Sequence, residues 1–79
     1  MTLMEALSAR LQELLNERNW SGYKLHLQSG VNQATIGDIK HCRNLGINLR
    51  LIYEISEGFG ISLAEFFDSP LFRDHNIVD

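Results

Sequence analysis

The chain of 79 residues is long enough for one domain and too short for two separate hydrophobic cores. Its hydrophobic fraction of 44% is typical of a folded globular protein and argues against intrinsic disorder. No stretch approaches the roughly 18 apolar residues of a membrane span, and the N-terminal residues do not resemble a signal peptide, so we expect a cytoplasmic protein with no membrane partner.

The net charge of −3 is unevenly distributed along the chain. Residues 18–50 contain five Lys or Arg side chains and one Asp, which gives +4, whereas residues 1–17 carry −2 and residues 51–79 carry −5. The electrostatic field near a surface depends on where charges lie and not only on their sum. The middle of the chain is therefore the part that favours an anionic partner.

The first predicted helix begins after Thr2 and extends to about Arg18. Thr2 and Glu5 have the spacing of a capping box, in which two side chains satisfy backbone amides at a helix start. Asn19 and Trp20 follow its end. Apolar residues recur at helical spacing and predict one buried face, made of Met4, Leu7, Leu11 and Leu14 and widened by Leu15.

The second predicted helix is short. Ser21 is its N-cap candidate, and Trp20 and Leu25 have the spacing of a hydrophobic staple. Gly30 ends it, because glycine adopts the left-handed backbone at a helix end without steric cost.

The third predicted helix extends from Gln33 to about His41. Asn32 precedes it as an N-cap candidate, and Val31 and Ile36 have staple spacing. A polar loop over residues 43–47 follows.

The fourth predicted helix extends from Asn48 to Phe59 and ends at Gly60. Ser62 and Glu65 then form a capping box for a short fifth helix that stops by Pro70, and residues 71–79 are expected to form a tail. The predicted buried stripe of the fourth helix is Leu51 (or Ile52), Ile55 and Phe59. The predicted fold class is all-α, because no alternating strand pattern occurs.

Two short helices joined at Gly30 have the pattern of a helix-turn-helix. The glycine lets the second helix leave at a steep angle, and that helix presents a polar outer face. In this motif the N-terminal residues of the second helix approach the base edges in the major groove. Four apolar residues are expected to hold the two helices together: Leu25, Val31, Ile36 and Ile39.

Several motifs at fixed spacing resemble the Cro/repressor (xenobiotic-response-element) family of helix-turn-helix regulators over roughly residues 7–68. The resemblance implies a compact five-helix bundle of the phage-repressor DNA-binding type over residues 1–70, a helix-turn-helix at about residues 21–41, and a tail over 71–79. It also implies operator DNA as a partner, a role in transcription regulation, and a possible homodimer. The motifs are Trp20-Ser21-x-Tyr23-Lys24-Leu25, Ser29-Gly30-Val31-x-Gln33-x-Thr35-Ile36, Leu49, and Gly60-Ile61-Ser62-Leu63-Ala64-Glu65-Phe66-Phe67.

The resemblance also implies DNA contacts. Gln33 matches the glutamine that begins the family's recognition helix, and glutamine suits a bidentate contact with adenine. Ser21 matches a phosphate clamp at a helix N-terminus, whereas Lys40 and Arg43 are expected near the far DNA backbone with Asn44. The predicted DNA-binding residues are Ser21, Tyr23, Asn32, Gln33, Ala34, Thr35, Asp38, Lys40, Arg43 and Asn44.

The chain departs from the family pattern at five positions. Gly22 replaces a common glutamine, His26 a common alanine, and Cys42 a common glycine, while Gly37 and Asp38 interrupt the recognition helix with a weak helix former and a negative charge. His26 is expected either to point along the groove between the helices or to push them apart. An alternative function is therefore a helix-turn-helix protein-interaction module with weak or no DNA binding.

No catalytic or metal site is predicted. Cys42 is the single cysteine, so no zinc-ligand set accompanies His26 and His41, and no nucleophile accompanies an Asp38–His41 pair. We therefore expect no enzyme activity, no cofactor and no small-molecule substrate. An apolar cluster near the C-terminus either closes the core or pairs two subunits: Phe66, Phe67, Leu71 and Phe72.

Overall fold

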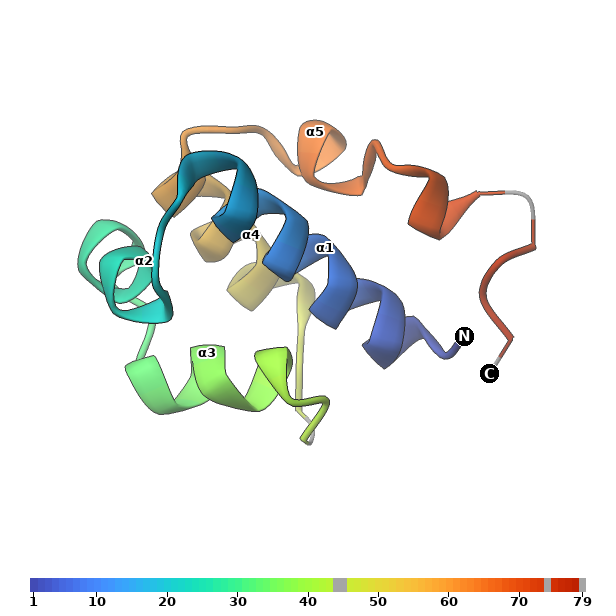
Figure 1. Cartoon of the computed structure of the whole chain (residues 1–79), viewed down its shortest axis with the longest axis horizontal. Coiled ribbons are helices and arrows are strands. Elements are labelled where there is room, and N and C mark those ends of the chain that lie inside the picture. The colour runs from blue at the N-terminus through green and yellow to red at the C-terminus, as the bar shows by residue number, and fades with distance from the viewer. Residues whose placement is uncertain (44–45, 74, 79) are drawn as a thin grey trace.

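A computed structural model gives the fold of the chain and describes residues 1–43, 46–73 and 75–78. These residues form five α-helices and one short 3-10 helix, with no strand among them (Figure 1). The all-α prediction is therefore confirmed. The elements are α1 (Leu3–Arg18), α2 (Gly22–Ser29), α3 (Gln33–Lys40), α4 (Leu49–Phe59), α5 (Leu63–Phe67) and η1 (Pro70–Phe72).

Four α-helices follow the N-cap residue that the sequence predicts, and α4 begins one residue later than expected, with Asn48 as its N-cap. The side-chain oxygen of each cap accepts a hydrogen bond from a backbone N–H in the first turn, which satisfies a group that has no partner within the helix. The capping boxes of α1 and α5 are both formed. The five N-caps are Thr2, Ser21, Asn32, Asn48 and Ser62.

Two predicted helix ends are also confirmed. Gly30 and Gly60 follow α2 and α4 with φ angles of 77° and 76°, in the left-handed region that glycine adopts without steric cost. Cys42 has a φ of 54° in the turn after α3, so a side chain occupies a left-handed position that favours glycine.

The hydrophobic core lies where the helices meet. α4 packs against α2, and α1 packs against α3. In α4 the sequence left Leu51 and Ile52 as alternatives; Ile52 is buried and Leu51 is half-buried at the edge. The buried core comprises Leu7, Leu11, Leu14, Leu15, Leu25, Val31, Ile36, Ile39, Ile52, Ile55, Phe59 and Phe66.

The C-terminal segment returns along α1 toward the N-terminus (Figure 1). Phe66 is buried in the core, and Phe67 stacks edge-on against both Phe66 and Phe72, with centroid distances of 5.1 Å in each pair. These aromatic rings close the core of the single chain. The tail also meets the first residue, because Val78 N donates to Met1 O at 2.8 Å.

No helix in the described part of the chain is long and apolar enough to cross a membrane.

Candidate nucleic-acid interface

The turn between α2 and α3 is held by polar contacts as well as by apolar ones. Leu25, Val31, Ile36 and Ile39 are all buried, as the helix-turn-helix pattern predicts. The Ser29 hydroxyl accepts from Val31 N at 3.0 Å, and His26 Nδ1 lies 2.7 Å from Val31 O. The imidazole therefore contacts the backbone of the turn. These contacts fix the direction in which α3 leaves α2.

The N-terminus of α3 presents polar groups to solvent. Asn32 Oδ1 caps the helix by accepting from Ala34 N at 2.7 Å, and its side-chain amide nitrogen hydrogen-bonds to no described group. Gln33 and Ala34 are exposed, whereas Thr35 is half-buried. Every residue in this first turn is described, and none of them is an Asp or a Glu. The partial positive charge of the helix N-terminus is therefore not neutralised by a carboxylate.

A second positive site lies at the N-terminus of α2. The Ser21 hydroxyl caps this helix by accepting from Lys24 N at 3.1 Å, and its fully described first turn also lacks an acidic residue. A β-carbon added at Gly22 would lie 3.9 Å from Lys40 Nζ. The Lys40 ammonium thus lies beside the first residue of α2, although the sequence suggested a more distant position on the DNA backbone. The absent side chain at Gly22 leaves room for it.

Lys24 belongs to the same site but was not among the predicted contacts. Its side chain is exposed in the first turn of α2, with Nζ 5.7 Å from the centre of the Trp20 ring. Within the described residues, neither Lys24 nor Lys40 lies within ion-pairing distance of a carboxylate. The sequence could have indicated this contact, because Lys24 lies three residues after the N-cap, in the first turn of the helix.

Near the C-terminal end of α3, the charges of Arg43 and Asp38 pair with each other. Arg43 Nε donates to Asp38 Oδ1 at 3.1 Å, and Arg43 N donates to Asp38 O at 2.7 Å. A β-carbon at Gly37 would lie 3.8 Å from Arg43 Nη2, so this guanidinium lies over the part of the helix where Gly37 has no side chain. Asp38 and Arg43 therefore largely neutralise each other. Asn44, the last predicted contact, lies outside the described residues.

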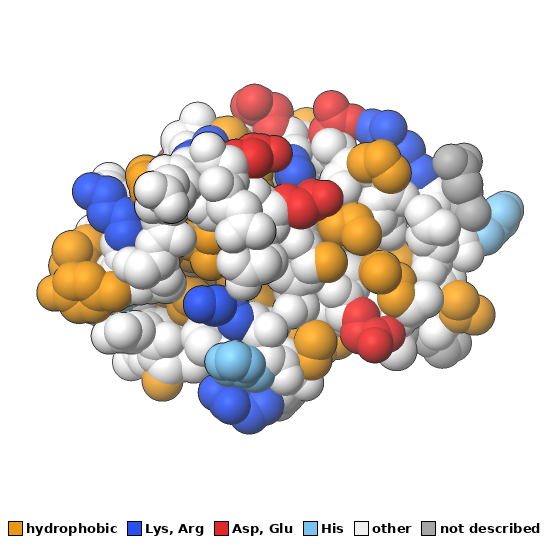
Figure 2. Space-filling model, viewed as in Figure 1, with side chains coloured by type: hydrophobic (Ala, Val, Ile, Leu, Met, Phe, Trp, Pro, Cys, Tyr) orange, Lys and Arg blue, Asp and Glu red, His pale blue; other side chains and the backbone are white. Residues whose placement is uncertain are grey.

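Unlike Lys24 and Lys40, Arg18 contacts the end of α4. Its Nη2 donates to Phe59 O at 3.1 Å, and its guanidinium carbon lies 4.9 Å from the centre of the Phe59 ring. Arg18 therefore ties α1 to the end of α4. Figure 2 shows Lys, Arg and His side chains over α3 at the bottom of the view, and Asp and Glu side chains mainly along the top and right. The uneven charge of the sequence thus becomes an uneven charge of the surface.

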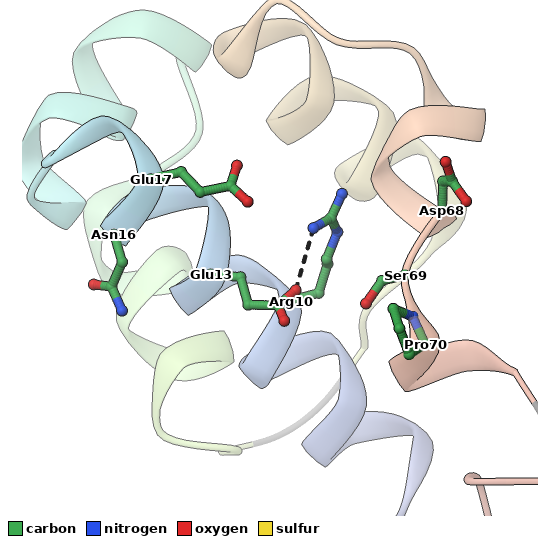
Figure 3. A pocket seen from close by; sticks show the side chains of 7 residues that line it. All are labelled: Arg10, Glu13, Asn16, Glu17, Asp68, Ser69 and Pro70. Atoms are coloured by element: carbon green, nitrogen blue, oxygen red, sulfur yellow. Dashed lines mark hydrogen bonds and ion pairs between the residues drawn. The ribbon is translucent and has the colours of Figure 1, made fainter.

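A solvent-open pocket lies away from α2 and α3, between α1 and the segment before η1 (Figure 3). Arg10 there is already engaged, because it donates to Glu13 Oε1 at 3.2 Å and to two backbone oxygens of α5. The described residues contain no cluster of three His, Cys, Asp or Glu side chains that would hold a metal ion. None of the predicted DNA-binding residues lines this pocket, whose walls are Arg10, Glu13, Asn16, Glu17, Asp68, Ser69 and Pro70.

No family model, no curated protein and no solved structure matches this chain.

Proposed function

We propose that the chain is a sequence-specific DNA-binding regulator of transcription that places α3 in the major groove and acts in the cytoplasm. One observation carries the proposal: in the two helices of the helix-turn-helix, α2 and α3, the positive N-terminus is not neutralised by an acidic residue in the first turn. The N-terminus of α3 exposes Gln33 and Ala34, and that of α2 lies beside Lys40. The proposal involves no catalysis and no cofactor.

Base recognition is assigned to the first turn of α3. The Gln33 carboxamide has one acceptor and two donor hydrogens, which match the N6 and N7 groups of adenine. The Asn32 amide nitrogen is available as a further donor, because only the oxygen of that side chain is used in the cap. The methyl group of Ala34 suits an apolar contact with the thymine methyl.

Phosphate binding is assigned to the start of α2. The backbone amides that follow Ser21 point out of the helix end, and the ammonium groups of Lys24 and Lys40 add charge beside them. Such contacts set the position of a protein on the duplex without reading its sequence. With two or three phosphate contacts per chain, affinity should fall about ten- to fortyfold between about 50 and 200 mM salt.

The test is selection of duplexes from a random pool, followed by fluorescence anisotropy with the selected duplex and a scrambled one at both salt concentrations. The expected result is a preference for the selected duplex that persists as total affinity falls with salt. Absence of binding to either duplex near 50 mM salt would exclude the DNA-binding proposal.

A protein-interaction module is the second candidate, and a specific observation favours it. Asp38 neutralises Arg43 at 3.1 Å, which removes one of the few cations near α3. Tyr23 and Leu27 are exposed one helical turn apart on α2, a pattern that suits contact with another protein. A folded chain that fails to bind DNA at low salt would favour this second function.

A further inference from the structure

Trp20 lies between α1 and α2, and contacts from α1 and α4 hold it in place. Its backbone N–H donates to Leu15 O at 2.9 Å, at the end of α1. Its indole ring stacks on the buried Phe59 ring of α4, with the two centroids 5.5 Å apart and the ring planes at 19°. The guanidinium carbon of Arg18 lies 5.9 Å from the centre of the same indole ring. The indole is therefore fixed directly before the first turn of α2.

The ammonium group of Lys24 lies over the indole ring of Trp20. Lys24 Nζ is 5.7 Å from the centre of the ring, within the distance of about 6 Å at which the ring quadrupole attracts a cation. Lys24 is otherwise exposed on the first turn of α2. No carboxylate in the described part of the chain lies within ion-pairing distance of this lysine. The ring is therefore the group that determines where the ammonium lies.

We propose that Trp20 is a positioning residue for DNA binding: its indole ring holds the Lys24 ammonium beside the N-terminus of α2, where a DNA phosphate binds. Trp20 acts through Lys24 in this role, and the role rests on the proposed function. It adds a requirement to that function, because phosphate binding at α2 then depends on a ring that α1 and α4 hold in place, outside the helix-turn-helix.

An aromatic ring positions a cation without neutralising it. Asp38 holds Arg43 by an ion pair at 3.1 Å, and this carboxylate cancels the charge that a phosphate would otherwise meet. An indole ring carries no net charge, so the Lys24 ammonium keeps both its charge and its N–H donors for a phosphate oxygen. The contact with Trp20 is thus compatible with phosphate binding by the same lysine.

The ring also lowers the entropic cost of phosphate binding. A free lysine side chain samples many rotamers, and it loses most of this freedom when its ammonium binds a phosphate. A side chain that is already held near its bound position loses less on binding. A contact between a cation and a ring at an exposed site corresponds to about a two- to fivefold change in affinity.

The first test measures the contact by NMR without DNA. Protons above the face of an aromatic ring resonate upfield, so the ε-methylene protons of Lys24 should resonate upfield of those of Lys40, whose ammonium lies beside Gly22. Trp20→Leu should remove this difference. Trp20→Phe, which keeps an aromatic ring to stack on Phe59, should retain part of it. Equal shifts for the two lysines of the wild-type chain would overturn the proposal, whether or not the variants fold.

The second test is a double-mutant cycle on DNA affinity, measured by anisotropy with the selected duplex. Trp20→Leu should weaken binding about two- to fivefold in the wild-type background and in the matched Lys40→Met background, but not in the Lys24→Met background. A purely structural effect of Trp20 on α2 would weaken binding equally in all three backgrounds, and that result overturns the proposal. Circular dichroism verifies that each variant is folded.

The proposed function and the role of Trp20 fail in different ways. A chain that binds no duplex at low salt contradicts the proposed function, and with it a role of Trp20 in DNA binding. A chain that binds DNA and loses the same affinity in all three backgrounds contradicts only the role of Trp20.

Discussion

His26 Nδ1 lies 2.7 Å from the backbone oxygen of Val31, across the turn that joins α2 to α3. A carbonyl oxygen only accepts, so the imidazole carries its hydrogen on Nδ1 and donates it. The backbone oxygen of the same histidine accepts from Gly30 N at 3.0 Å. His26 therefore anchors Gly30 and Val31, two of the three residues between α2 and α3.

Replacing this imidazole should loosen the turn. We expect His26→Ala to lower the free energy of unfolding by about 1–2 kcal/mol, because the partly buried Val31 carbonyl loses its donor. Urea denaturation measures the change. Gln28→Ala, an exposed position on the same helix, is the control and should change stability by less than about 0.5 kcal/mol. Equal stability of the two variants would contradict the role of the imidazole.

Two of the helical glycines, Gly58 and Gly37, should respond to alanine in opposite directions. A β-carbon at Gly58 would lie 2.5 Å from Ser29 Cβ and 2.9 Å from its Cα, so Gly58→Ala should destabilise the chain by about 1–3 kcal/mol through overpacking of α4 on α2. At Gly37 the nearest atom would be Arg43 Nη2, at 3.8 Å. Gly37→Ala should therefore stabilise the chain by about 1 kcal/mol through helix propensity.

Thermal unfolding of both variants tests this prediction. A stabilised Gly58→Ala variant would show that α4 and α2 do not approach as closely as Gly58 and Ser29 do here.

The charges near α3 should contribute unequally to DNA binding. Lys40→Ala should weaken binding to all duplexes and reduce the salt slope by about 0.9, because one phosphate contact is lost. Arg43→Ala should have a smaller effect, since Asp38 already neutralises that guanidinium. Asp38→Asn should strengthen binding to all duplexes. Anisotropy titrations at several salt concentrations measure all three, and an effect of Arg43→Ala as large as that of Lys40→Ala would contradict the assignment.

Gln33 should affect which sequence is bound. Its side chain is exposed at the first position of α3, so Gln33→Ala should leave stability nearly unchanged. It should lower the preference for the selected base at one position by about 1–3 kcal/mol. Competition with duplexes that differ at single base pairs measures the preference. An unchanged preference at every position would exclude Gln33 as a base contact.

The capping box of α1 should give stability a dependence on pH. The hydrogen bond from the Thr2 backbone N–H to the Glu5 carboxylate, at 2.7 Å, holds the pKa of Glu5 below its ordinary value of 4.5, and the Thr2 hydroxyl adds to this effect. A lowered pKa in the folded state means that the stabilisation is present above the unfolded pKa and is lost as pH falls through the folded pKa.

Glu5→Gln tests this linkage. The variant should be less stable than the wild type near pH 7, and the difference should disappear as pH falls below the pKa of Glu5 in the folded chain. Urea denaturation over a pH series provides the measurement. A difference that stays constant over the whole series would show that the charge of Glu5 does not stabilise α1.

The local structure of this protein follows from short-range patterns in its sequence. The capping residues, Gly30 and Gly60, and the spacing of apolar residues specify where each helix begins, ends and is buried, because caps and left-handed turns depend on groups within about four residues. The same periodicity predicts that the side chains of Gln33 and Ala34, at the start of α3, are exposed.

Which charged side chains lie close together depends instead on how the helices pack. Lys40 lies beside Gly22, eighteen positions earlier in the sequence, because α3 crosses the start of α2 at an angle that the turn and the core impose. Arg18 contacts Phe59, and the choice of Ile52 over Leu51 as the buried residue likewise depends on how α4 is rotated against its neighbours. Helical periodicity defines an apolar face to within about one residue, whereas packing against other helices decides which side of that face is buried.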